Sequence, residues 1–224
     1  MIKTRLFTIA AVAAAALLAG CAHKPPAYDY TAFRQANPKT LLVMPPLNDS
    51  PEVKAGSSIW AQATLPLSEA GYYVLPVTLV DETLRQNGID TAYDAQNIPR
   101  DKLRDYFGAD AAVYIKVTKY GTAYHVISSD TVVEAQARIV DLRSGALLWE
   151  GKAIASSAEQ GNGGGGGLAG ALVGAIVKQI INTTTDAAYN YAGIADSRLL
   201  GAPRYNGVLA GPRSPAYGKD AETH

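Results

Sequence analysis

Residues 111–151 read AAVYIKVTKYGTAYHVISSDTVVEAQARIVDLRSGALLWEG, and this stretch decides the fold. Apolar and polar side chains alternate twice along it, with the period of two that is typical of strands with one buried face. A third strand is expected over residues 146–157, after a tight turn in which Gly145 can adopt positive φ. The stretch therefore predicts an antiparallel meander with one wet face, on which the alternation places Tyr114 and Tyr120.

Upstream of the meander, the sequence predicts a βαβ unit. Residues 40–46, TLLVMPP, form a short apolar run that two prolines close, as is typical of a buried strand. A helix is expected to follow, with Ser57 or Ser58 as its N-cap and with Pro66 kinking or dividing it. Residues 72–77 then form the second strand, parallel to the first.

The segment after the meander is rich in glycine. Residues 159–181 read EQGNGGGGGLAGALVGAIVKQII and lack the Gly-Lys-Ser/Thr that ends a Walker phosphate-binding loop. Residues 168–177 are ten uncharged residues, whereas a helix needs about 20 to cross a bilayer. We interpret the glycines as a flexible connection to a long helix over residues 168–200. Its apolar stripe packs either on the sheet of this chain or on a neighbouring subunit.

Together these elements predict one α/β (α+β) domain over residues 40–200. Its mixed sheet has about five strands: the N-terminal βαβ unit and the three-strand meander, followed by the long C-terminal helix. Two short helices, at residues 78–87 and 98–107, join the βαβ unit to the meander. Residues 201–224 are rich in Gly, Pro and Ser and are expected to form a disordered tail.

The N-terminus has the features of an exported lipoprotein. Lys3 and Arg5 precede an uncharged apolar run, an arrangement typical of a signal peptide. The end of this run resembles a bacterial lipobox, with residues Leu18, Ala19, Gly20 and Cys21. We therefore predict that the signal peptide spans residues 1–20 and that Cys21, the only cysteine, is acylated with diacylglycerol and palmitate.

This processing determines where the protein is expected to act. Acyl chains contribute about 0.8 kcal/mol per buried methylene, so a multiply acylated Cys21 anchors the chain stably to a membrane. Residues 21–39 are then the acylated N-terminus and a tether. Alanine at position 22, where aspartate would favour the inner membrane, favours the outer membrane by resemblance to enterobacterial sorting. The expected localisation is a lipid anchor on the periplasmic side of the outer membrane.

Composition argues against several classes of function. Loss of Lys3 and Arg5 lowers the number of basic residues from 20 to 18, against 20 acidic residues, so nucleic acid is not an expected partner. The three histidines, His23, His125 and His224, lie far apart in the sequence and predict no metal site. The chain has no G-x-S-x-G motif. We expect no cofactor and no enzymatic activity.

One polar loop is a candidate binding site. Asn48, Asp49, Ser50 and Glu52 follow the carboxyl end of the first strand, where open α/β sheets commonly bind ligands. Asn, Asp and Ser beside proline are also ordinary turn-forming residues. The sequence leaves both interpretations open. Tyrosine is abundant, with 13 residues against 3 phenylalanines, which hints at protein interfaces.

Two stretches resemble a known fold. Residues 41–52, LLVMPPLNDSPE, resemble the first strand and loop of the N-terminal domain of TolB, of CsgG and of related envelope lipoproteins. Residues 137–151 are similar to a strand, turn and strand of the same group, with matches at Asp141, Gly145 and Trp149. From the lipobox to about Leu200, the chain resembles a family of Gram-negative lipoproteins of unknown function. The resemblance implies a TolB-like or CsgG-like α/β fold and carries over no activity.

Three functions are compatible with these observations. The first is a non-enzymatic protein-interaction module of an envelope secretion or transport complex, with other envelope proteins, CsgG-like ones included, or a second copy as partner. The second is a small-ligand-binding protein or enzyme that uses the loop of residues 48–52. The third, a CsgG-like pore subunit, is the least supported, because residues 121–136 alternate irregularly and lack aromatic girdles.

Overall fold

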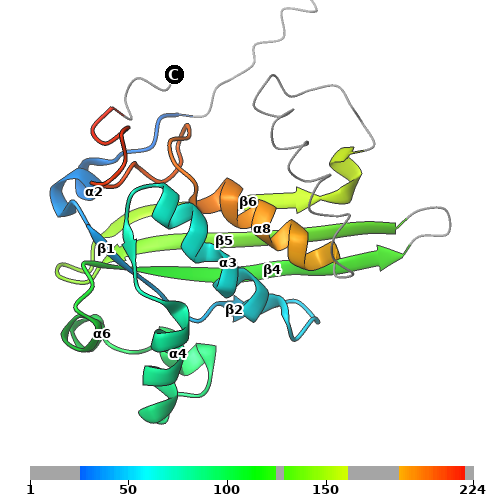
Figure 1. Cartoon of the computed structure of the whole chain (residues 1–224), viewed down its shortest axis with the longest axis horizontal. Coiled ribbons are helices and arrows are strands. Elements are labelled where there is room, and N and C mark those ends of the chain that lie inside the picture. Colours follow the sequence, from blue (N-terminus) through cyan, green and yellow to red (C-terminus); the bar gives the residue numbers. More distant parts are fainter. Residues whose placement is uncertain (1–25, 125–128, 161–186, 220–224) are drawn as a thin grey trace, which may run out of the picture.

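The computed structural model describes residues 26–124, 129–160 and 187–219. It shows a mixed sheet with helices on both faces (Figure 1). The strands are β1 (Thr40–Val43), β2 (Leu47–Asn48), β3 (Tyr73–Val74), β4 (Ala111–Tyr124), β5 (Ser129–Asp141) and β6 (Leu147–Ser156). The helices are α2 (Thr31–Ala36), α3 (Ala55–Glu69), α4 (Val77–Gln86), α5 (Ala92–Gln96), α6 (Arg100–Phe107), the 3₁₀ helix η1 (Ser157–Gln160) and α8 (Ala187–Leu200).

The order of the strands confirms the predicted fold class. Within the described residues the sheet has six strands in the order β3-β1-β4-β5-β6, with β2 paired to β4. β1 and β3 are parallel and α3 joins them, which is the expected βαβ unit. β4, β5 and β6 are antiparallel, which is the expected meander. The α/β (α+β) prediction is therefore confirmed, although β3 is shorter than the expected strand over residues 72–77.

Two apolar clusters hold the helices on the sheet. The larger cluster joins one face of β4, β5 and β6 to α3 and α8, and it includes Ile59, Ile139 and Leu199. The smaller cluster lies on the other face, where α4, α5 and α6 cover the end of the sheet near Leu42 and Tyr114. These helices leave part of this face uncovered, and Lys116, Gln136 and Arg138 are exposed there as the alternation predicts. Tyr114, expected to be wet, is buried because the helices reach it.

A β-bulge in β4 explains a second wrong expectation. The register of β4 against β5 shifts between Val117 and Lys119. A bulge adds one residue to one strand, so the side chains beyond it change face. Tyr120 therefore points into the larger cluster, where its hydroxyl donates a hydrogen bond to Ser58 Oγ at 3.0 Å. A period-two pattern read from sequence contains no signal for this insertion.

Helix α3 also differs from its prediction. Lys54 is its N-cap and makes no side-chain cap hydrogen bond, so neither Ser57 nor Ser58 caps the helix. Ser57 Oγ instead donates back to the Lys54 carbonyl at 3.0 Å. Pro66 does not divide the helix, which continues to Glu69. Proline removes one backbone hydrogen bond, and this loss is best tolerated close to a helix end.

Both ends of the described chain pack on the domain, contrary to the expected tether and disordered tail. In α2 Phe33 is buried, and the tail of residues 201–219 buries Val208, Leu209 and Ala210. The Tyr72 hydroxyl donates to the Leu209 carbonyl at 2.6 Å. The tail has no regular secondary structure. Side-chain and backbone hydrogen bonds to the body of the domain hold it in place. The folded unit therefore extends beyond the predicted limits of 40–200 at both ends.

Several predictions lie outside the described residues. These are the signal peptide, the lipobox with Cys21, residue His125 and the glycine run with the start of the long helix. The described part of that helix, α8, packs on β5, β6 and α3 of its own chain. In the ranges that the structure describes, no helix is long and apolar enough to cross a membrane.

Candidate functional site

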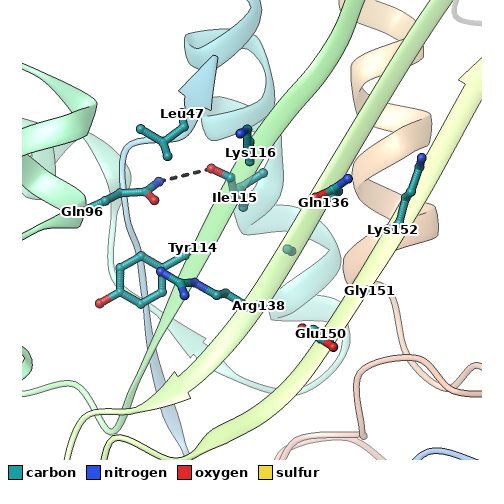
Figure 2. Close-up of a pocket in the computed structure, with 11 residues that line it drawn as sticks. Leu47, Gln96, Tyr114, Ile115, Lys116, Gln136, Arg138, Glu150, Gly151 and Lys152 are labelled. Atoms are coloured by element: carbon teal, nitrogen blue, oxygen red, sulfur yellow. Dashed lines mark hydrogen bonds between the residues drawn. The ribbon is translucent and has the colours of Figure 1, made fainter. Parts of the chain in front are cut away.

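The uncovered face of the meander carries an open pocket of about 560 Å³ (Figure 2). β4, β5 and β6 supply most of its lining, and α5 and β2 close one side. We call this surface the meander face and define it by its polar lining residues: Gln96, Lys116, Gln136, Arg138, Glu150 and Lys152. The side chains from the three strands lie side by side, because Lys116 pairs in register with Gln136, and Arg138 pairs with Glu150.

Ion pairs hold the basic side chains of this surface in place. Lys116 Nζ lies 2.7 Å from Asp49 Oδ2. Glu134 sits between two lysines, 2.6 Å from Lys152 Nζ and 3.1 Å from Lys119 Nζ. The Glu134 side chain is only 7% exposed, whereas the lysine side chains are 49% and 65% exposed. Exposed ion pairs are individually weak, but a shared and shielded carboxylate restricts where both ammonium groups can lie.

The electrostatics of Glu134 reflect these contacts. A hydrogen bond from Lys152, followed by those from Lys119 and Thr118, lowers the pKa of Glu134 to about 2, although burial acts in the opposite direction. The Thr118 hydroxyl donates to Glu134 Oε1 at 2.9 Å. Glu134 is therefore ionised near neutral pH. It acts as a fixed counter-charge rather than as a group that exchanges protons near neutral pH.

Arg138 and Tyr114 form a second fixed element of the meander face. The Arg138 guanidinium carbon lies 4.9 Å from the centre of the Tyr114 ring, a cation–π contact that Figure 2 shows. Burial raises the pKa of Tyr114, and the nearby Arg138 charge opposes that shift. Gln96 Nε2 donates to the carbonyls of Pro45 and Ile115, at 2.8 and 3.2 Å, and so joins α5 to the sheet. The surface is thus built from preformed polar contacts.

The predicted loop of residues 48–52 lies beside the meander face, and its polar groups stabilise its own turn. Asn48 Oδ1 accepts hydrogen bonds from the Ser50 amide at 2.9 Å and from Ser50 Oγ at 2.7 Å. Asn48 Nδ2 donates to the Glu52 carbonyl at 2.8 Å. Only Asp49 faces the pocket lining, through its ion pair with Lys116. The geometry favours the turn interpretation for Asn48 and Ser50 and gives Asp49 a place at the rim of the surface.

Two of the matched residues, Asp141 and Trp149, and Asp110 before β4 also have structural partners. Asp110 Oδ2 accepts from the amides of Lys39 and Thr40, at 2.9 and 3.1 Å, and so fixes the start of β1. Asp141 accepts from the amide and hydroxyl of Ser144 and so shapes the turn into β6. Trp149 Nε1 donates to the Asn206 carbonyl at 2.9 Å. These residues hold the fold, which explains why a fold-level resemblance could be read from them.

The meander face itself was only partly visible in the sequence. The alternation placed Lys116, Gln136 and Arg138 on the wet face, but it did not indicate which part of that face the helices leave uncovered. That information depends on where α4, α5 and α6 dock. Among the side chains that the structure describes, no three His, Cys, Asp or Glu residues converge as a metal site would require. The arrangement can form hydrogen bonds and ion pairs with a partner.

These features define a class: an α/β domain with a mixed sheet, behind an N-terminus that resembles a lipoprotein export signal. Residues 28–213 match the family described as "Putative lipoprotein GNA1162-like", and the chain belongs to this family. It is 46% identical over 206 residues to the "Putative lipoprotein NMB1124/NMB1162" of Neisseria meningitidis serogroup B, covering 92% of this chain and 95% of that protein.

One solved structure agrees with this assignment. The crystal structure of lipoprotein GNA1162 from Neisseria meningitidis is 47% identical and superposes with a TM-score of 0.53, covering 65% of this chain and 100% of that chain. The PelC dodecamer from Paraburkholderia phytofirmans is also similar, at 12% identity and a TM-score of 0.41, covering 78% of this chain and 90% of that one. The predicted membership in a lipoprotein family is confirmed. The likeness to TolB and CsgG stays an interpretation of the sequence.

Proposed function

We propose that the protein is a non-enzymatic interaction module, anchored through Cys21 on the periplasmic side of the outer membrane, and that the meander face binds another envelope protein. The observation that carries this proposal is the meander face itself. Its three cationic side chains are held in place by Asp49, Glu134 and the Tyr114 ring. A partner therefore meets a charge pattern that is already ordered.

The chemistry of the surface supports a protein partner. Arg138 and Lys152 alternate with Gln136 and Glu150 on neighbouring strands, so donors and acceptors of both signs are interspersed. Such a pattern gives specificity and correct orientation at protein interfaces more than it gives raw affinity. Restricted side chains also lose less conformational entropy on binding. Within that proposal, the partner belongs to an envelope secretion or transport complex, for which this lipoprotein is an accessory subunit.

Site-specific cross-linking tests the proposal. A photo-cross-linking amino acid placed at Gln136 in the full-length, acylated protein should yield a discrete adduct with another protein in intact cells. The same amino acid at Gln86, exposed on α4, should not. Arg138→Glu should abolish the Gln136 adduct, because it reverses a charge beside Glu150. The matched reversal Arg85→Glu on α4 should leave the adduct unchanged.

Two outcomes would contradict the proposal. One is the absence of any adduct at Gln136 when the protein is at its native level and correctly attached to the membrane. The other is an Arg138→Glu variant that retains its thermal stability and the full yield of the adduct. Thermal unfolding of each variant separates loss of contact from loss of fold.

A second candidate function has one specific observation in its favour. The pocket on the meander face has a volume of about 560 Å³, within the range of about 300–1,000 Å³ that is usual for small-molecule sites. In this case a polar ligand would bind next to the Asp49–Lys116 ion pair. A thermal-shift screen of polar metabolites would find a stabilising compound, and Lys116→Gln would abolish its effect.

A further inference from the structure

The chain leaves the folded domain very close to the proposed acylation site. Asn206 Oδ1 accepts a hydrogen bond from the Tyr28 amide at 2.9 Å, and Asn206 Nδ2 donates to the Pro26 carbonyl at 2.9 Å. The Tyr30 hydroxyl donates to the Gly207 carbonyl. The side chain of Asn206 therefore fixes the chain to the domain from residue 26 onward.

This attachment limits how far the domain can lie from the membrane. Four residues lie between Cys21 and Pro26, so five steps of roughly 3.3–3.6 Å in a fully extended chain separate their Cα atoms by at most about 18 Å. A domain of about 200 residues is about 40 Å across, as its expected radius of gyration implies. The linker is therefore shorter than the domain that it holds. A short linker allows the domain to turn only part of its surface toward the lipid.

The surface next to the linker differs in charge from the rest of the protein. Figure 1 shows residues 26–39 and the tail of residues 201–219 together at one side of the molecule, with α4 and α6 at the opposite side. We call these two segments the basic end. Lys and Arg outnumber Asp and Glu there by five to one, a net charge of +4: Arg34, Lys39, Arg204, Arg213 and Lys219 against Asp29.

The remainder of the domain has the opposite charge. Residues 40–200 contain 12 Lys and Arg against 17 Asp and Glu, a net charge of −5. The near-neutral total of the chain thus conceals a separation of charge, which Lys24 increases and which Asp220 and Glu222, just after Lys219, decrease.

From these observations we propose that the basic end rests on the headgroup layer of an anionic phospholipid membrane, with α4 and α6 directed away from it. This inference rests on the proposed acylation of Cys21. Lys and Arg side chains within a Debye length of anionic headgroups are attracted to them. The short linker and the charge separation act in the same direction, so the domain has one preferred orientation on the membrane.

Energy transfer to the membrane tests the orientation. Because acylation blocks the Cys21 thiol, a fluorophore can be attached selectively at Tyr217→Cys or, as the matched control, at Tyr106→Cys on α6, where the native side chain is 69% exposed. The acylated full-length protein is reconstituted in vesicles that contain phosphatidylglycerol and a headgroup acceptor. We expect strong transfer from position 217 and weak transfer from position 106. Equal transfer from both positions, or stronger transfer from 106, would overturn the proposal.

Vesicle binding without the anchor tests the electrostatic part. The whole mature chain with Cys21→Ser should bind phosphatidylglycerol vesicles and not phosphatidylcholine vesicles, and 0.5 M NaCl should release it. Each basic residue lost near the surface should weaken binding about fivefold. Arg213→Gln with Lys219→Gln should thus weaken binding about 25-fold, whereas Arg85→Gln with Lys102→Gln should not. Equal effects of the two double variants, or equal binding to both lipids, would refute the proposal.

A failure of the proposed orientation can be distinguished from a failure of the proposed anchoring. If Cys21 is not acylated, 0.5 M NaCl releases the full-length protein from cell membranes and the anchoring proposal fails. The vesicle preference of the Cys21→Ser chain is measured without any acyl group and stands or falls independently. If acylation occurs but position 217 lies no closer to the lipid than position 106, the anchoring holds and the orientation is wrong.

Discussion

Asp196 is a buried acid whose replacement should stabilise the protein. It lies in α8 with 0% of its surface exposed, and neither carboxyl oxygen has a hydrogen-bond partner among the described residues. Gly193, three residues earlier on the same side of the helix, would place a Cβ 2.4 Å from Gln62 Oε1. Asp196 therefore occupies the side of α8 that faces α3, where water cannot solvate its charge.

The cost of this arrangement can be estimated. A buried polar group without a partner destabilises a protein by about 1–3 kcal/mol. Alanine is the best helix former and exceeds aspartate by roughly 0.5 kcal/mol, while the small void left by the carboxyl group costs about 1 kcal/mol. Asp196→Ala should therefore raise the free energy of unfolding at pH 7 by about 0.5–2.5 kcal/mol. For a domain of this size the melting temperature should rise by about 2–4 °C per kcal/mol.

The pH dependence gives a sharper test. Burial raises the pKa of Asp196 well above its usual value of 3.8. The folded protein then keeps a proton that the unfolded chain has released, so the contribution of Asp196 to stability is most favourable below about pH 3.8 and becomes less favourable as pH rises toward the folded pKa. Asp196→Asn has the same size but cannot ionise, so it should remove this contribution while leaving a buried polar group in place.

Urea unfolding measured between pH 4 and pH 8 distinguishes the outcomes. The difference in unfolding free energy between Asp196→Asn and the wild type should grow with pH across this window, in favour of the variant. The reasoning would be refuted if Asp196→Ala lowered stability by more than 1 kcal/mol and if the wild type and Asp196→Asn kept a constant difference. Such a result would mean that the carboxylate is paired in the folded protein.

Four further predictions concern three side-chain contacts and the lipobox. Glu134→Gln should lower the free energy of unfolding at pH 7 by about 1 kcal/mol. Because the folded pKa of Glu134 is about 2, the wild type should lose this advantage as pH falls from about 4.5 toward 2, which unfolding of both proteins across this pH range would show. Gly151→Ala should cost about 1–3 kcal/mol in thermal unfolding, since its Cβ would lie 2.3 Å from the Trp149 ring. Trp149→Phe should lose the hydrogen bond to the tail and speed limited proteolysis after residue 200, with unchanged proteolysis arguing against that anchor. Cys21→Ala should abolish palmitate incorporation and let 0.5 M NaCl release the protein from membranes, and continued labelling would contradict the lipobox assignment.

The fold was largely predictable because strong local periodicity coincided with simple topology. The meander could be read from alternation, and the βαβ unit from two apolar runs around a helix. What could not be read were effects of tertiary contact. The bulge after Val117 turns Tyr120 from the wet face to the core. The docking of helices α4, α5 and α6 on the sheet buries Tyr114. Both changes depend on residues distant in the sequence, which local periodicity does not report.

The candidate site shows the same limit. The loop of residues 48–52 was singled out by its polar composition, yet Asn48 and Ser50 are engaged with each other. Lys152 was not singled out, because its importance depends on Glu134 in the neighbouring strand. Residue type indicates what a side chain can do. The partners that a strand register supplies decide whether the side chain is free to bind a ligand.

The packing of both chain ends on the domain also depends on tertiary contacts that the sequence pattern does not report. Gly, Pro and Ser in residues 201–219 predicted disorder, but one buried apolar segment, at residues 208–210, and the hydrogen bonds of Asn206 fix both this tail and residues 26–28. If Cys21 is acylated as proposed, their packing shortens the linker after Cys21 from 18 residues to the four residues 22–25. A long linker would make the direction of the meander face arbitrary. With a short linker and a basic end, the proposed anchoring would determine which side of the domain a partner can reach.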